Sequence, residues 1–211
     1  MKQRKRIFAM LLLVFFAGFL LLSCEGTVKK PTMYLAPAEL SEAEEKLAKL
    51  LGEDGTNYIY DFKLNDTVKS IQVNTYELKD GTWQLFAGGG GYAFSDDKGR
   101  LALAFDNLKA GVRIALQGEK DNSATTYASE PLEESEQMSR ATSWLQNSEE
   151  ILYEKEIPLV VQVLTTQNSI SSYGVEAFEN PEEYAKHGYE HVYAVTIRFS
   201  KKSVSELDSE I

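Results

Sequence analysis

The chain has 211 residues, with 22 basic and 32 acidic side chains and a net charge of −10 at neutral pH. Its length fits one domain with an extra arm, and its single cysteine excludes a disulfide framework or a cysteine-based zinc cluster. The acidic excess argues against nucleic acid as a partner, because phosphate binding requires basic patches. Beyond residue 23 the acidic excess is larger, since 18 basic and 32 acidic side chains give a net charge of −14.

The first 23 residues have the pattern of a secretory signal. A basic start is followed by the sixteen residues Ile7–Leu22, which are apolar except for Gly18. A membrane-spanning helix needs about 20 apolar residues, so the run is short for an anchor. We therefore expect residues 1–23 to be a signal peptide; an uncleaved anchor is the competing interpretation. The basic residues of the start are Lys2, Arg4, Lys5 and Arg6.

The end of this segment resembles a bacterial lipoprotein signal. Leu21-Leu22-Ser23-Cys24 is similar to the lipobox, although Leu22 stands where a smaller residue is more usual. The resemblance implies cleavage between Ser23 and Cys24 and a diacylglycerol thioether on Cys24. It also implies an exported protein on the outer face of the bacterial cytoplasmic membrane, or in the outer membrane where the source has one. Two or three acyl chains hold a protein stably on a bilayer.

Residues 24–40 are expected to form a polar tether, because glycine, lysine and proline disfavour a helix or strand there. The first helix is predicted over residues 42–51. Ser41 and Glu44 form a capping box at its start, and Gly52 is the expected stop.

Short strands with turns every 8–12 residues follow, which is typical of an all-β sandwich or barrel. Apolar residues alternate with polar ones in each run, and Asp80-Gly81 favours a hairpin turn. The expected strands are 58–64, 68–78, 82–87, 92–94, 101–105 and 112–116.

Residues 118–150 break this pattern, because they are rich in acidic, serine and threonine residues. A short strand is possible over 125–128, and the rest is predicted to be a long excursion. Such a loop in a compact domain is either functional or mobile. Trp144 is the large aromatic exception, which either covers an edge of the body or anchors a partner.

The C-terminal third returns to strand character over residues 151–153, 157–166 and 189–199. Asn180 is predicted to cap a short helix with Pro181 at its first position. Residues 201–211 are expected to be a polar, frayed tail. The fold prediction is therefore a mainly-β, single sandwich-like domain over 41–200, with an N-terminal helix and a short helix before the last strand.

No catalytic constellation stands out. His187 and His191 lie four residues apart, but Gly188 and the following strand pattern separate them, so we predict no metal site. No Gly-x-Ser-x-Gly sequence marks a nucleophile. Paired carboxylates could support a hydrolase, yet no pair can be chosen among so many acids.

The four glycines 88–91 lack the Lys-Ser/Thr and the helix of a phosphate-binding loop, and they lie between two expected strands. A loop or bulge with unusual backbone angles is the better interpretation. Gly89 and Gly90, together with Trp144, remain the candidate contacts for a ligand or partner.

The body resembles small uncharacterised lipoproteins of Gram-positive bacteria, through residues 123–127, 142–145 and 180–199. That family has no established activity, so the resemblance implies location and architecture. We predict a non-enzymatic ligand-binding or interaction module without a cofactor, held on the membrane by Cys24 and facing an extracellular ligand or envelope protein. The alternatives are an accessory subunit that docks another envelope protein through residues 129–150, and a carboxylate-dependent hydrolase.

Overall fold

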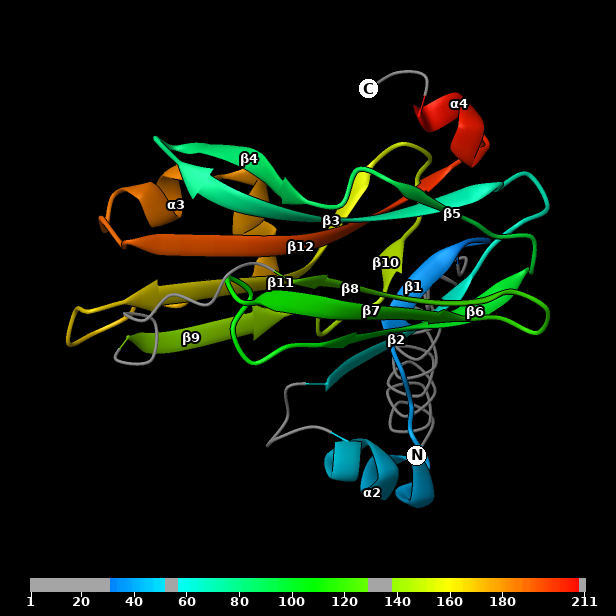
Figure 1. Cartoon of the computed structure of the whole chain (residues 1–211), viewed down its shortest axis with the longest axis horizontal. Helices are drawn as coiled ribbons and strands as arrows, with labels where there is room; N and C mark the ends of the chain where they lie inside the picture. Colours follow the sequence, from blue (N-terminus) through cyan, green and yellow to red (C-terminus); the bar gives the residue numbers. More distant parts are fainter. Residues whose placement is uncertain (1–30, 52–56, 129–137, 209–211) are drawn as a thin grey trace, which may run out of the picture. The chain divides into compact units, whose positions relative to one another are not determined.

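The computed structural model describes residues 31–51, 57–128 and 138–208, which form one compact unit from Thr32 onward. This unit is mainly β and contains two antiparallel sheets, as the alternating sequence pattern predicts. The sheets lie one over the other (Figure 1).

The first sheet has the strand order β10-β1-β2-β6-β7-β8. Strands β6, β7 and β8 follow one another as antiparallel hairpins, whereas β2 and β6 are neighbours although β3, β4 and β5 of the second sheet lie between them in sequence. The strands are β1 (Tyr34–Pro37), β2 (Asn57–Lys63), β6 (Lys98–Ala104), β7 (Gly111–Gln117), β8 (Asn122–Ala128) and β10 (Glu149–Glu150).

The second sheet has the order β4-β3-β12-β11-β9, and β5 also pairs with β3. Its two longest pairings join β3 to β12 and β12 to β11. The strands are β3 (Ser70–Lys79), β4 (Thr82–Ala87), β5 (Gly91–Ala93), β9 (Ser139–Trp144), β11 (Glu156–Thr165) and β12 (His191–Ser200).

The core fills the space between the sheets with side chains from the longer strands, which alternate between core and solvent in the first sheet. In β7, Val112, Ile114 and Leu116 are buried while the residues between them are not. One buried polar contact crosses the core, because the Tyr60 hydroxyl donates to the Leu159 carbonyl at 3.0 Å. Burial of these apolar faces is the main force that holds the sheets together.

The second sheet is also covered on the face that points away from the first sheet. The short helices η2 (Val175–Glu179) and α3 (Glu182–Ala185) pack there and bury Val175 and Tyr184. Phe178 stacks on Trp83, whose indole N–H donates to the Phe178 carbonyl at 2.8 Å. This cover explains why β3 and β12 are buried on both faces.

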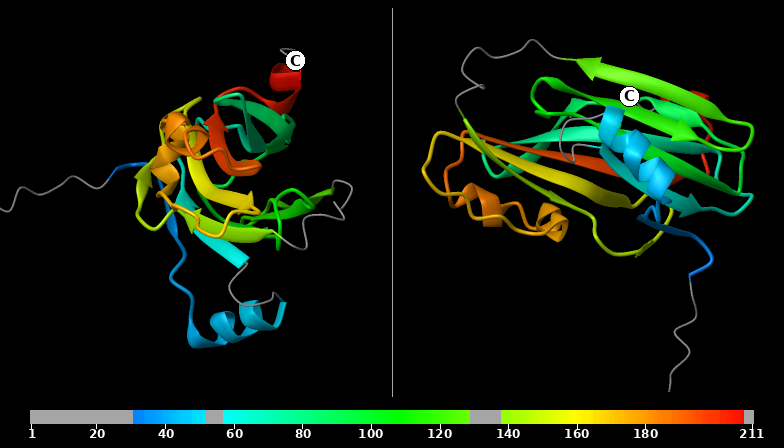
Figure 2. Two further views of the ribbon diagram at one scale, coloured as in Figure 1. Left: turned by 90° about the vertical axis from the view of Figure 1, so that its left-hand side faces the viewer. Right: turned by 90° about the horizontal axis from the view of Figure 1, so that it is seen from below.

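The predicted first helix is α2 (Glu42–Leu51), and its capping box is present. The Ser41 N–H donates to Glu44 Oε2 at 2.8 Å, and the Glu44 N–H donates to Ser41 Oγ at 3.3 Å. The helix stands off the first sheet (Figure 2), with Leu47 57% and Leu50 82% exposed.

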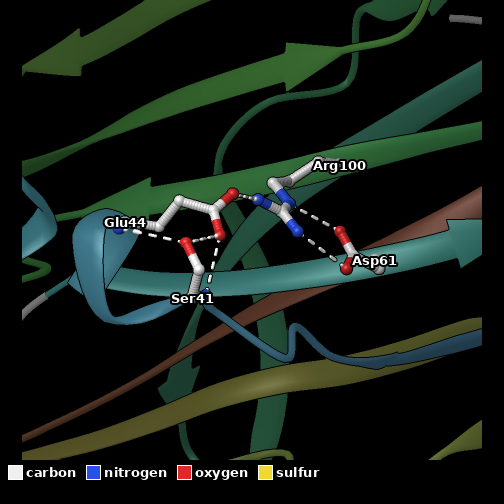
Figure 3. A network of polar contacts seen from close by, with 4 residues as sticks. All are labelled: Ser41, Glu44, Asp61 and Arg100. Carbon is white, nitrogen blue, oxygen red and sulfur yellow. Dashed lines mark hydrogen bonds and ion pairs between the residues drawn. The ribbon is translucent and has the colours of Figure 1, made fainter.

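An ionic network ties α2 to the first sheet (Figure 3). Arg100 on β6 donates from Nη1 to Glu44 at 2.9 Å, and from Nε and Nη2 to Asp61 at 2.6 and 2.9 Å. Hydrogen bonds from Ser41 and then from Arg100 lower the pKa of Glu44 to about 2.

Three sequence predictions about element boundaries miss a strand or a helix, and a fourth is wrong because residues 151–153, expected to be a strand, form a loop and turn. The expected tether 24–40 contains strand β1, because Leu35 is fully buried and β1 pairs with β2. Strands β9 and β10 lie inside the expected excursion 118–150, where pairing with β11 and β1 compensates for polar sequences. Residues 24–30 and 129–137 lie outside the described part of the chain.

The expected tail contains the third error, since α4 (Val204–Asp208) forms there and buries Leu207. The N–H and hydroxyl of Ser203 both donate to Glu206, which is a capping box. In the short helix before the last strand, Pro181 is the cap, and Asn180 contributes its carbonyl instead of its side chain.

Candidate functional site

The predicted lipid-attachment residue Cys24 and its neighbour Ser23 lie outside the described residues. No helix in the described part of the chain is long and apolar enough to cross a membrane. Export and lipid anchoring therefore remain predictions from the sequence.

The glycine run forms a bulge between β4 and β5. Ala87 pairs with Thr75 and Gly91 with Gln72, so three glycines stand opposite two residues of β3. Gly88 and Gly89 have positive φ angles of 113° and 83°. A Cβ on Gly88 would lie 2.7 Å from the Val73 carbonyl oxygen, so this position requires glycine.

Side chains of β3 hold this bulge in place. The Gly89 N–H donates to Asn74 Oδ1 at 2.9 Å, and Gln72 Nε2 donates to the Gly89 carbonyl at 3.1 Å. The polar backbone groups of Gly89 thus have partners within the chain. The bulge accounts for Gly88 and Gly89 by local geometry, whereas a Cβ on Gly90 would meet no atom within 4 Å and nothing in the structure explains glycine there.

Trp144 lies at the end of β9, on the outer edge of the second sheet. Its ring tilts against Tyr58 at 5.7 Å between centroids, and 44% of the residue is exposed. Trp144 therefore covers part of the sheet edge, as one of its two predicted roles requires. It also lines a groove.

This groove, which we call the β9–η2 groove, has a volume of about 680 Å³. Its floor contains Ser143, Glu156 and Pro158, from the ends of β9 and β11 that meet on the outer face of the sheet. One wall is the chain from Ser172 to Glu179, including η2. The other contains Gln146 and Asn147 of the β9–β10 connection together with Glu149 and Glu150 of β10.

Ser143 and a buried tyrosine fix the position of the first wall. Ser143 Oγ donates to the Tyr173 carbonyl at 2.5 Å and hydrogen-bonds Ser172 Oγ at 2.8 Å. The rings of Tyr173 and Tyr184 meet edge to face at 5.2 Å. The segment that begins at Ser172 therefore contacts both strand β9, through Ser143, and helix α3, through Tyr184.

Glu156 is the least exposed of the five glutamates that line the groove, and three donors orient it. Asn74 Nδ2 and the Tyr76 hydroxyl donate to its Oε1 at 3.2 and 3.1 Å, and the Thr196 hydroxyl donates to its Oε2. Burial and then the negative charge of Glu156 raise the pKa of Tyr76 to about 12. Tyr76 consequently stays protonated and keeps donating at neutral pH.

The groove is strongly acidic. Five glutamates and a single lysine, Lys155, line it, and Lys155 lies 3.4 Å from one of those glutamates, Glu179. The acids come from three separate elements, β10, β11 and η2, so the negative charge of the groove is not confined to one segment. The five are Glu149, Glu150, Glu156, Glu176 and Glu179.

The two histidines belong to separate networks. His187 Nε2 bonds the Tyr173 hydroxyl at 2.7 Å, whereas His191 lies between Glu77 at 3.4 Å and Lys109 at 2.8 Å. Within residues 31–51, 57–128 and 138–208, no three histidine, cysteine or acidic side chains are grouped to hold a metal ion.

Two other carboxylates, Glu190 and Glu44, accept hydrogen bonds from nearby side chains of the chain itself. Glu190 accepts hydroxyl hydrogen bonds from Thr165 and Thr166, each at 2.5 Å, and these two bonds lower its pKa to about 2. Glu44 in the capping box behaves in the same way. Both lie outside the β9–η2 groove.

No protein-family model, curated protein or solved structure matches this chain. The resemblance of the body to small lipoproteins therefore stays a prediction. Of the sequence candidates, Trp144 lines the groove and the two glycines do not. Sequence reasoning missed the glutamates of the walls, although the density of acids between residues 149 and 179 was a visible signal.

Proposed function

We propose that this chain is an exported lipoprotein, anchored through Cys24, whose β-sandwich binds a ligand in the β9–η2 groove without chemical conversion. The observation that supports the binding role is the groove itself, a cavity of about 680 Å³ with exposed polar walls. Its volume lies within the range of about 300–1,000 Å³ that is usual for ligand sites, although its lining is more polar than most.

The anchor is supported by the residue pattern at the start of the chain. A basic segment, a sixteen-residue apolar run and Leu21-Leu22-Ser23-Cys24 follow one another in the order that lipoprotein processing requires. Cys24 is the sole cysteine, so no other thiol competes for this modification.

The anchor is tested with Cys24→Ser in bacterial cells. We expect the variant to keep its signal or to leave the membrane fraction, because serine cannot form the thioether. Mass spectrometry of the wild-type N-terminus should find acyl chains on Cys24. An unmodified Cys24 in the mature protein would refute this part of the proposal.

The groove is tested by calorimetric titration of the full lipoprotein, purified from membranes in a non-ionic detergent. The probes are the alternating hexapeptides Lys-Thr-Lys-Thr-Lys-Thr and Glu-Thr-Glu-Thr-Glu-Thr and the neutral sugar cellohexaose. We expect at least one to bind and Trp144→Ala to weaken that binding about fivefold or more, because each exposed contact contributes about 1 kcal/mol. Leu47→Ala, at another exposed apolar residue on α2, is the matched control.

Binding of no probe would overturn the proposed binding role. Binding that Trp144→Ala and Leu47→Ala leave equally strong would place the ligand elsewhere and would also overturn it. Leu47→Ala should leave the urea unfolding midpoint unchanged, whereas Trp144→Ala loses the ring contact with Tyr58 and should lower the free energy of unfolding by about 1 kcal/mol. A cooperative urea transition in both variants confirms that the fold is intact.

A further inference from the structure

We propose that the β9–η2 groove binds an extended segment of a basic polypeptide, with lysine or arginine side chains at alternate positions. This inference rests on the proposed binding function and names the chemistry of its ligand. Three features of the groove support it: the charge of its walls, its aromatic side chains, and the strand at its edge.

Charge is the first feature. Four exposed glutamates line the groove: Glu149 and Glu150 come from β10, and Glu176 and Glu179 from η2. Lys155 lies within ion-pair distance of only one of them, Glu179. A ligand with ammonium or guanidinium groups would therefore gain attraction from both walls, whereas an anionic ligand would be repelled.

Aromatic rings are the second feature. Trp144 lines the groove and is 44% exposed, and cations bind favourably over the face of an exposed indole ring. Tyr173, on the opposite wall, already has an ammonium group over its ring, because Lys186 Nζ lies 5.3 Å from the ring centroid. The chain thus uses one aromatic ring of this groove to bind a cation of its own.

The strand edge is the third feature, and it favours a polypeptide over a small polycation. Residues 142–145 line the groove, and β9 is the outer strand of the second sheet in the described part of the chain. An outer strand offers main-chain N–H and C=O groups to an added strand. In an added strand every second side chain faces the same way, so alternate basic residues would all reach the groove.

The test compares four probes on the full lipoprotein in low salt. They are the alternating peptide Lys-Thr-Lys-Thr-Lys-Thr, the same composition in blocks as Lys-Lys-Lys-Thr-Thr-Thr, spermine, and cellohexaose. The alternating and block peptides have equal charge, so a difference between them isolates strand-like binding. We expect the alternating peptide to bind most tightly and its affinity to fall in higher salt.

Charge-neutral variants locate the site. The double substitution Glu150→Gln and Glu176→Gln removes one acid from each wall, and we expect it to weaken the alternating peptide about fivefold, as two exposed ion pairs would. The matched control is Glu45→Gln with Glu182→Gln, which removes the same charge from exposed glutamates that do not line the groove. It should leave the affinity unchanged.

The following results would contradict the inference. Spermine or the block peptide binding as tightly as the alternating peptide would overturn the inference and leave the binding function standing. Cellohexaose binding in place of the peptides would do the same. Equal effects of the two double variants would also overturn it. Failure of all four probes would overturn the inference, and failure of Glu-Thr-Glu-Thr-Glu-Thr as well would overturn the proposed function.

Discussion

The glycine bulge and the β9–η2 groove both involve strands of the second sheet, and they differ in how they use their polar groups. In the bulge, the backbone of Gly89 bonds to Asn74 and Gln72, so its hydrogen-bonding capacity is used within the chain. In the groove, four of the five glutamates are exposed on the walls. An unusual sequence can therefore serve geometry alone, while an ordinary acidic sequence forms the proposed binding surface.

The largest expected loss of stability comes from a substitution in the glycine bulge. Gly88→Ala places a Cβ 2.7 Å from the Val73 carbonyl oxygen at a φ of 113°, where an L side chain is strained. We expect a loss of about 3 kcal/mol in the free energy of unfolding, measured with urea. Gly90→Ala is the control, because a Cβ there meets no atom within 4 Å. Equal stability of the two variants would contradict a structural role.

Asn74 links the two regions, because it accepts from Gly89 and donates to Glu156. Asn74→Ala should destabilise the fold by about 1.5 kcal/mol, since it leaves a part-buried N–H without a partner. Hydrogen exchange of the Gly89 amide should also become faster. Asn74→Asp keeps the acceptor for Gly89 but brings a second negative charge to Glu156, so it should protect that amide and still lower stability.

A smaller loss of stability is expected when the pH is lowered. The pKa of Glu190 is lowered to about 2 in the folded chain, against 4.5 without these contacts. Its contribution to stability is therefore complete above pH 4.5 and is lost as the pH falls toward 2. NMR titration of the Glu190 carboxyl checks the value, and Thr166→Val should raise it. An ordinary pKa in the wild type would show that the threonine hydrogen bonds do not persist in solution.

The smallest effect on stability is expected in the groove. Glu176 is exposed, and Glu176→Gln should change the free energy of unfolding by no more than about 0.5 kcal/mol. The same urea measurement applies. A loss as large as that of Asn74→Ala would mean that the wall glutamates stabilise the fold, and the contrast with the bulge would disappear.

Alternation of side chains made the hairpin from β6 to β7 predictable, because each residue that faces the core there is apolar. The capping box of Ser41 and Glu44 made α2 predictable for a similarly local reason. Ser203 and Glu206 are paired in a similar way, but the residues around them are polar and show no apolar stripe that would predict a helix.

Strands β1 and β9 were beyond local prediction because they depend on their partners. The serine- and threonine-rich β9 becomes a strand by pairing with the strongly apolar β11. The groove follows from that pairing, since it exists only where β9, β11 and the segment before η2 meet. Trp144 was recognisable as an exposed aromatic residue, but the acids around it could be grouped only in three dimensions.

Helix α2 is held to the first sheet by ion pairs, whereas the two sheets are held to each other by apolar burial. Arg100 joins Glu44 to Asp61 through ion pairs, while Leu47 and Leu50 remain in solvent. Added salt screens such ion pairs, whereas sulfate strengthens apolar burial. In concentrated sulfate, the attachment of α2 therefore weakens while the sandwich becomes more stable, so the helix and the sheets respond to the same solvent in opposite directions.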